Sequence, residues 1–255
     1  MTRLRCFLTI SLFYAVKSYQ LHLSIACVRQ IHFTICRCYT AFYKLRGKTM
    51  PTSEIVRLTS DTKNSAVELL IRAFHNDPMY LHIFPDSDER SHSLCLLWDA
   101  LLSYSLRFGE AYTTPGVDGV VCWLTPGNTS IGFLRALRTG FGIQQAVIRF
   151  NSDSRKRFLP IVNHADKTHN SIMTNRHWYL WLLGVEPESQ GQGIGGSLIK
   201  PVLDKADAEN IPVYLETETA ENVVFYEKRG FEVVREDSIA EGNVTLWAML
   251  RKPHG

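Results

Sequence analysis

The chain has 255 residues, of which 45% are hydrophobic and 21% are charged, a composition typical of globular proteins. It excludes a disordered, collagen-like or coiled-coil protein. The formal net charge is +3, yet no Asp or Glu precedes Glu54, and eight of the 28 Lys and Arg residues lie before position 50. The remainder has 20 basic and 25 acidic residues and no basic run, which argues against nucleic acid as a partner.

Residues 1–49 thus form a basic extension, and residues 50–255 are expected to form one domain. The longest apolar stretch of the extension has 11 residues, whereas a membrane span needs about 20. Three interpretations fit the extension: a secretory signal peptide, although no clean cleavage site follows; an organellar transit peptide; or a true translation start at Met50. We expect a cytoplasmic protein, or a mitochondrial one if the extension is a transit peptide, with the chemistry downstream of Met50.

Cysteine spacing gives no sign of a disulfide framework or a metal site. Four of the six cysteines lie in the extension. Cys36 and Cys38 lack the two-residue gap typical of zinc ligands, and no His pair follows them at the spacing of a zinc finger. We therefore expect reduced thiols and no metal.

The first half of the domain alternates helices with a hairpin. A short strand at residues 55–58 precedes a helix that starts at Ser60 and Asp61 and has apolar residues at helical spacing as far as Phe74. The Asp77-Pro78 step ends this helix. A second helix is predicted over 90–107 and a hairpin of strands over 110–114 and 119–124. Residues 130–158 are predicted to be mainly helical with a break at 140–142, and the polar stretch 163–170 is predicted to be a loop.

The second half is built around a glycine-rich turn. Residues 177–185 are apolar on both faces, as in a central strand. Four glycines in positions 191–196 follow, and an apolar helical stripe runs from there to residue 206. Strands are predicted over 212–216, 231–235 and 244–250, and a helix over 222–229. Pro201 lies inside the long helix, where it should cost about 3 kcal/mol.

A glycine-rich turn at a helix N-terminus offers unpaired N–H groups and the positive end of the helix dipole, which suits a pyrophosphate. Gly191, Gly193 and Gly196 satisfy the G-x-G-x-x-G pattern of dinucleotide-binding folds, and Glu216 lies 20 residues on, where such folds place a ribose-binding acid. However, four residues separate the strand from the turn, and only 59 residues remain after Gly196. The architecture therefore disfavours a dinucleotide site.

The same segment also resembles a family signature. Gln190-x-x-Gly193-x-Gly195 after a strand ending in LLGVEP, followed by LETETAENVVFYEKRGF, resembles the signature of the GNAT superfamily of acyl-CoA-dependent N-acetyltransferases. The closest similarity is to the puromycin N-acetyltransferase type. The resemblance covers about residues 54–252 and is specific over 177–235. It implies an α/β (α+β) GNAT fold, with a mixed, mostly antiparallel twisted sheet flanked by helices and splayed between the strands at 177–185 and 212–216.

The resemblance also implies acetyl-CoA as cosubstrate. Backbone N–H groups of the turn would hold its pyrophosphate, and the strand edge at residues 183–185 would pair with its pantetheine amides. The residues expected to bind it are Leu183, Gly184, Val185, Gln190, Gly191, Gln192, Gly193, Ile194, Gly195, Gly196, Ser197, Asn222 and Phe225.

Catalytic roles follow by the same similarity. Tyr226 resembles the general acid that protonates the departing thiolate, and Glu216 is the best candidate for the general base. His75, Asp77 and Tyr80 lie where the family lines its acceptor pocket. Direct transfer is expected, because no Cys or Ser accompanied by a base occurs in the matched motifs.

The sequence thus predicts an acetyl-CoA-dependent N-acetyltransferase that acts on an amine of a small molecule, which the sequence does not identify. Expected partners are acetyl-CoA and that amine, with a homodimer as a further state to test, and without nucleic acid or a membrane span. Two alternatives stay open: an NAD- or FAD-binding oxidoreductase, and a GNAT-like module that binds acyl-CoA without catalysis.

Overall fold

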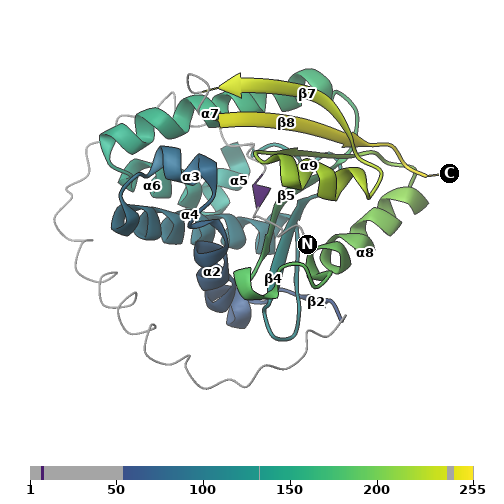
Figure 1. Cartoon of the computed structure of the whole chain (residues 1–255), viewed down its shortest axis with the longest axis horizontal. Helices are drawn as coiled ribbons and strands as arrows, with labels where there is room; N and C mark the ends of the chain where they lie inside the picture. The colour runs from purple at the N-terminus through teal and green to yellow at the C-terminus, as the bar shows by residue number, and fades with distance from the viewer. Residues whose placement is uncertain (1–6, 9–53, 132, 240–243, 255) are drawn as a thin grey trace. The chain divides into compact units, whose positions relative to one another are not determined.

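The computed structural model describes residues 7–8, 54–131, 133–239 and 244–254 (Figure 1). The expected extension and its cysteines lie outside the described residues, apart from Phe7 and Leu8. The helices are α2 (Ser60–Phe74), α3 (Pro78–Ile83), α4 (Ser87–Phe108), α5 (Phe133–Arg138), α6 (Gly142–Arg149), α7 (Ser152–Ile172), α8 (Ile194–Ala208) and α9 (Ala220–Glu227). The strands are β1 (Phe7–Leu8), β2 (Val56–Arg57), β3 (Glu110–Thr113), β4 (Gly119–Leu124), β5 (Trp178–Val185), β6 (Val213–Thr217), β7 (Glu232–Ile239) and β8 (Val244–Arg251).

Side chains at the helix starts explain several of these boundaries. Asp77 precedes α3, and its Oδ1 accepts a hydrogen bond from the Met79 N–H at 2.9 Å. Asp86 and Asn151 cap α4 and α7 in the same way. Because an N-cap oxygen satisfies an N–H that has no partner within the helix, each of these residues fixes where its helix begins.

The prediction of a loop over 163–170 is wrong, because α7 continues through that stretch. Its sequence is polar, but Ala165, Thr168 and His169 are buried on one face of the helix. The helix α3 was not predicted either. The predicted helix at Pro201 is confirmed. Pro201 lies on the exposed side of α8, where the carbonyl group that loses its N–H partner can be solvated.

The described strands form one mostly antiparallel sheet in the order β2-β3-β4-β5-β6-β8-β7, and β1 pairs with β5. β5 and β6 are parallel, and they pair only at Trp178 with Val213 and at Tyr179 with Tyr214. Beyond this two-residue seam the strands part. The splayed, mixed sheet that the sequence predicted is therefore present.

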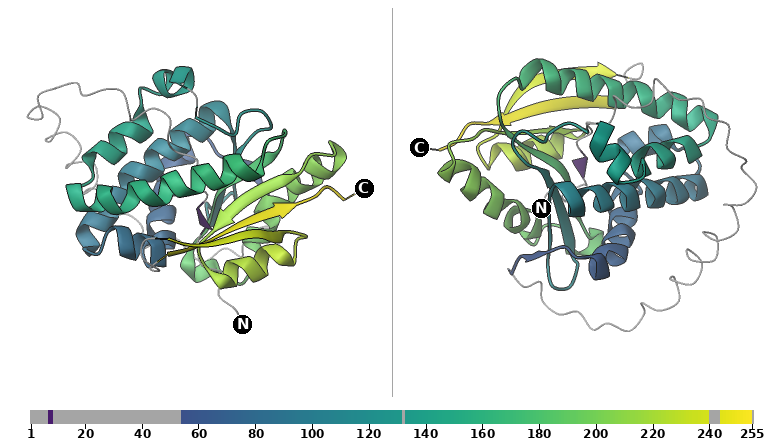
Figure 2. Two further views of the ribbon diagram at one scale, coloured as in Figure 1. Left: turned by 90° about the horizontal axis from the view of Figure 1, so that it is seen from above. Right: turned by 180° about the vertical axis from the view of Figure 1, so that it is seen from behind.

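Helices cover both faces of the sheet. One apolar cluster joins α2, α3, α4, α6 and α7 to one face, and a second joins α8 and α9 to the opposite face. Figure 2 shows the sheet between these two layers. β5 contributes to both clusters, with Trp181 in the first and Leu183 in the second. The turn between β5 and α8 is thus held by a strand that is buried on both sides.

No helix within the described ranges is both long enough and apolar enough to cross a membrane.

Candidate functional site

The turn between β5 and α8 depends on glycines in the left-handed backbone region. Gly191 has a φ of 80° and Gly193 a φ of 85°, which other L-residues adopt only with strain. An added Cβ at either glycine would meet no atom within 4 Å, so open space lies beside both. Gly193 caps α8 without a side-chain hydrogen bond. The first N–H groups of α8 therefore have no side-chain cap and lie beside open space.

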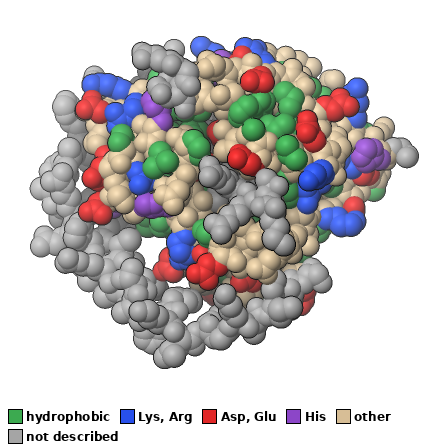
Figure 3. All heavy atoms as spheres, viewed as in Figure 1, with side chains coloured by type: hydrophobic (Ala, Val, Ile, Leu, Met, Phe, Trp, Pro, Cys, Tyr) green, Lys and Arg blue, Asp and Glu red, His purple; other side chains and the backbone are tan. Residues whose placement is uncertain are grey.

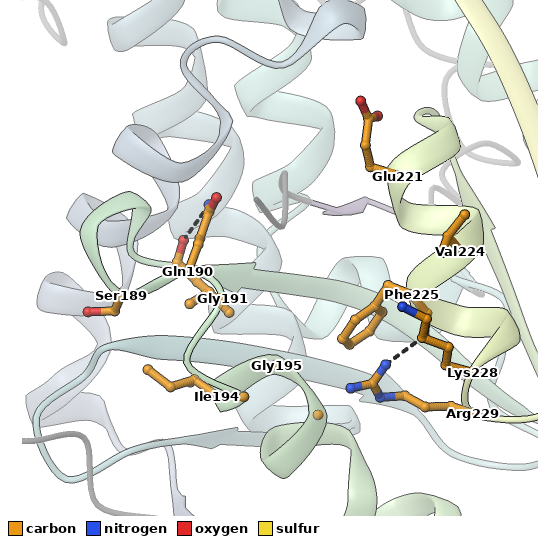
Figure 4. A pocket seen from close by; sticks show the side chains of 13 residues that line it. Ser189, Gln190, Gly191, Ile194, Gly195, Glu221, Val224, Phe225, Lys228 and Arg229 are labelled. Atoms are coloured by element: carbon orange, nitrogen blue, oxygen red, sulfur yellow. Dashed lines mark hydrogen bonds between the residues drawn. The ribbon is translucent and has the colours of Figure 1, made fainter. Parts of the chain in front are cut away.

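A cavity of about 310 Å³ lies between this turn and α9 (Figure 4). Val185, Ser189, Gln190, Gly191, Gly193, Ile194, Gly195 and Gly196 line one side, and Glu221, Val224, Phe225, Lys228 and Arg229 line the other. Backbone N–H groups and the helix dipole thus face two cations across the cavity. This combination suits an anionic phosphate group.

Arg229 is held in place by contacts to α9 and lies close to the first turn of α8. Its Nη1 donates to the Phe225 carbonyl at 2.6 Å, and its guanidinium lies 3.5 Å from the centroid of the Phe225 ring. A Cβ on Gly196 would come within 2.6 Å of its Nη2. Burial lowers the pKa of Arg229 below its ordinary value, yet a guanidinium stays charged in proteins. Gly196 is therefore the position that lets this cation approach the helix N-terminus.

Eight of the thirteen residues predicted to bind the cofactor line this cavity, and five do not. Gln192 donates its side-chain amide to the Glu188 carbonyl, and the Ser197 hydroxyl donates to the Gly193 carbonyl. Asn222 is fully buried and donates to the Thr217 hydroxyl at 3.1 Å. The other two, Leu183 and Gly184, lie farther down β5.

Gly184 has a packing role. A Cβ there would meet Leu70 of α2 at 2.5 Å, so the glycine permits close approach of α2 to the strand. Gln190 has a structural role as well, because its amide donates to the Val185 carbonyl at 3.2 Å and braces the turn against the end of β5.

The strand edge predicted to pair with pantetheine lies where β5 and β6 part. The Glu186 N–H donates to the Asp118 carbonyl, next to β4. Because N–H groups alternate between the two edges of a strand, those of Leu183 and Val185 point to the opposite edge. At this edge β1 pairs with β5, with Phe7 opposite Leu183. A ligand that used the whole edge would therefore have to displace β1.

Tyr226 lies on α9 and is 1% exposed. Its ring contacts Phe225 and Phe231 at centroid distances of 5.1 and 5.4 Å. Burial raises the pKa of its phenol well above the ordinary value, and the nearby charge of Glu218 raises it further. The phenol is thus neutral and able to donate a proton, although Tyr226 lines neither of the described cavities.

Glu216 is 1% exposed and lies on the same face of β6 as Tyr214, whose ring packs against His169 of α7. Its two oxygens accept hydrogen bonds from the hydroxyls of Tyr179, at 2.6 Å, and Tyr214, at 2.8 Å. Burial raises its pKa to about 8, against the opposing effect of these two hydrogen bonds. At neutral pH the carboxyl is therefore mainly protonated, and it lines neither of the described cavities.

None of the three residues predicted to line the acceptor pocket is among the lining residues of the two cavities that the structure describes. His75 lies at the end of α2 and is within hydrogen-bonding distance of Ser87. Asp77 is buried as the cap of α3. Tyr80 is fully buried and packs against Phe74 and Trp98. The two residues that follow Asp77 do line a cavity, because Pro78 and Met79 belong to the walls of a second one.

This second cavity measures about 260 Å³ and lies at the N-terminal end of α9. It is lined by Pro78, Met79, Glu218, Thr219, Ala220, Glu221, Val244, Thr245 and Trp247. Glu221 also lines the first cavity, so the two are neighbours. Sequence reasoning missed Glu218, Trp247, Lys228 and Arg229. The only available signal was the basic pair at the end of the NVVFYEKR segment, which can mark a phosphate site.

Among the residues that the structure describes, no group of three or more His, Cys, Asp or Glu is arranged to hold a metal ion.

Comparison with known proteins relates this geometry to a family. Residues 141–252 match the model of the acetyltransferase (GNAT) domain. Over an alignment of 205 positions, the chain is 26% identical to an uncharacterized N-acetyltransferase of Schizosaccharomyces pombe, and the alignment covers 77% of this chain and 82% of the relative. A histone acetyltransferase HPA2 and related acetyltransferase from Corynebacterium glutamicum has a similar solved structure, with a TM-score of 0.56 and 20% identity over 80% of this chain and 97% of that one.

These matches confirm the GNAT fold that the sequence predicted. They do not favour the oxidoreductase or the non-catalytic module. The mostly antiparallel sheet agrees, because a dinucleotide-binding fold has a mostly parallel one.

Proposed function

We propose that this chain, an N-acetyltransferase with the GNAT fold, transfers the acetyl group of acetyl-CoA to an amine of a small molecule by direct attack. The observation that carries the proposal is the cavity between the glycine turn and Arg229. It supplies backbone N–H groups from one side and cations from the other, as a pyrophosphate requires. The residues proposed to hold it are those of the turn, with Lys228 and Arg229.

The edge of β5 that parts from β6, where β1 pairs with it, supplies the proposed acyl site once the ligand displaces β1. N–H groups of Leu183 and Val185 point to this edge, and one of them would donate to the acetyl carbonyl as negative charge develops on its oxygen. The amine nitrogen forms a bond to the carbonyl carbon, the C–S bond breaks, and its electron pair leaves on sulfur. The edge thus orients the thioester and stabilises the tetrahedral intermediate.

Tyr226 is the proposed general acid for the thiolate. Its burial favours the neutral phenol, which can donate a proton to sulfur as charge builds there. Its position on α9, one residue after Phe225 of the cofactor cavity, supports this role. Glu216 remains a candidate base. Because its pKa is about 8, it would accept the amine proton only in its ionised fraction, and it would act through the tyrosine hydroxyls that enclose it.

This proposal includes acetyl-CoA as the donor and a small molecule as the acceptor. It also includes the similarity to the puromycin N-acetyltransferase type. The motifs over residues 177–235 support that similarity, but they do not identify puromycin as the acceptor. The modest volume of the second cavity, about 260 Å³, supports a small acceptor.

Binding of acetyl-CoA can be tested without knowing the acceptor. Thermal denaturation with acetyl-CoA should show stabilisation that reaches about 2.7 kcal/mol at a ligand concentration 100 times its dissociation constant. NAD at the same concentration is the control. A shift with NAD and none with acetyl-CoA would refute the assignment. A turnover screen across amines that detects the free thiol then tests catalysis.

A further inference from the structure

The second cavity, at the N-terminal end of α9, combines carboxylates with an apolar wall. Glu218 and Glu221 belong to its lining, and Asp77 directly precedes Pro78, which also lines it. None of its described lining residues is Lys, Arg or His. Figure 3 shows acidic side chains beside hydrophobic ones on the face over α9 and β8. The described residues that line this cavity therefore carry a net negative charge.

Glu218 is the central carboxylate of the cavity. It directly follows β6, and only 7% of it is exposed. Its negative charge raises the pKa of Tyr226 on α9 and that of Tyr80 on α3. For both tyrosines burial is the larger cause of the raised pKa, and the charge of Glu218 comes second. One carboxylate thus lies near both the proposed general acid and the segment predicted to bind the acceptor.

An independent feature of the same wall is the hydroxyl of Thr219. This residue is 5% exposed and occupies the N-cap position of α9, but it makes no side-chain cap hydrogen bond. Its Oγ1 has no hydrogen-bond partner among the described residues. Because a buried hydroxyl without a partner costs free energy, this oxygen is suited to a ligand that carries N–H donors.

We propose that the second cavity is the acceptor site and that Glu218 selects amines that lack a carboxylate, which means decarboxylated amines rather than amino acids. This inference rests on the proposed function. An alkylammonium group would enter toward Glu218, with the Thr219 hydroxyl as a second acceptor for its N–H groups. The amine loses its proton before it attacks the thioester.

The apolar residues of the second cavity would contact the uncharged part of such a ligand. Pro78, Met79, Val244 and Trp247 offer a surface for a hydrocarbon or aromatic body. An amino acid would bring its carboxylate close to Glu218 and Glu221, and like charges that meet in a partly closed site repel strongly. The acetamide product has no ammonium charge, so it loses its attraction to these carboxylates. A reaction of the decarboxylase class would supply the substrate.

Matched substrate pairs test this proposal, because the members of each pair differ only in one carboxylate. The probes are cadaverine against lysine and phenethylamine against phenylalanine, with acetyl-CoA as donor. In the full-length protein, kcat/KM should be about 100-fold higher for each amine than for its amino acid. Glu218→Gln should lower kcat/KM for the amines at least tenfold and narrow the amine-to-amino-acid ratio, without changing KM for acetyl-CoA.

Glu227→Gln is the matched control, because Glu227 is an exposed glutamate of α9 that lines neither described cavity. It should leave all four rates unchanged, and thermal denaturation of both variants checks folding. Equal rates for an amine and its amino acid, or an unaltered ratio in Glu218→Gln, would overturn the selectivity while leaving the acetyltransferase function in place. Failure of acetyl-CoA to bind the wild-type protein would instead overturn the proposed function.

Discussion

Replacing Glu216 by Gln should remove the part of the pH dependence of folding stability that the titration of this carboxyl causes. This carboxyl is 1% exposed and accepts hydrogen bonds from Tyr179 and Tyr214, and burial raises its pKa to about 8 from an ordinary value of 4.5. The folded protein therefore keeps a proton that the unfolded chain releases. Stability from this group is present below pH 4.5 and is lost as the pH rises through 8.

The magnitude follows from the two pKa values. Well between the two values each pH unit weakens folding by about 1.36 kcal/mol, and the slope is smaller near each pKa, so the contribution falls by about 3.5 kcal/mol between pH 5 and pH 8. Glutamine has nearly the same shape and does not ionise. Relative to wild type, Glu216→Gln should therefore gain about 3.5 kcal/mol of unfolding free energy between pH 5 and pH 8.

Urea unfolding of both proteins at each pH provides the measurement. Comparing them at the same pH removes the contribution of other groups. His169 is one such group: burial lowers its pKa to about 3, so its stabilising effect is lost as the pH falls from about 6.5 towards that value. If the difference between wild type and variant stayed constant from pH 5 to pH 8, Glu216 would be ionised in the folded protein, and the reasoning would fail.

Three further changes test the site. Tyr226→Phe should lower turnover roughly 10²-fold or more without changing folding or the affinity for acetyl-CoA. Tyr104→Phe, a control at a buried tyrosine of α4, should not affect turnover. Unchanged turnover in Tyr226→Phe would show that Tyr226 is not the general acid. Gly193→Val should abolish the thermal shift with acetyl-CoA. Gly127→Val is the control, because Gly127 has a φ of 82° and equally open surroundings. Each substitution should lower the folding stability by about 1–2 kcal/mol, but Gly127→Val should keep the thermal shift. A chain that starts at Met50 should fold, keep its turnover and bind acetyl-CoA at least as tightly, because it lacks the β1 that pairs with β5; insoluble protein or a large fall in turnover would contradict this.

The strand, turn and helix at residues 178–208 could be predicted from the sequence, because local rules govern them. A strand buried on both faces is apolar throughout, and a turn with positive φ needs glycine. The resemblance to GNAT enzymes made it possible to predict that β5 and β6 part. This is a long-range feature, which the local sequence pattern does not reveal.

Other features were missed because tertiary contacts decide them. The polar stretch at 163–170 is helical, since its few buried residues suffice to pack against the sheet. Glu218 and Trp247 come together only through the pairing of β6 with β8. Glu216 stays the predicted base, but sequence spacing did not reveal that its face of β6 points into the core or that two tyrosines enclose it. Which of several glutamates reaches a cavity depends on strand register, and sequence spacing alone does not specify it.

The seam between β5 and β6 has a consequence for the motions of the protein. Only two residue pairs join these strands, and at one of them Tyr179 and Tyr214 both hold the Glu216 carboxyl. The sheet is therefore two smaller sheets joined by a short hinge, and local opening at the hinge should need less free energy than global unfolding. A ligand held between β5 and α9 would bridge the two halves. Amide hydrogen exchange at Trp178 and Tyr179 would then slow when the cavity fills, although neither residue lines it.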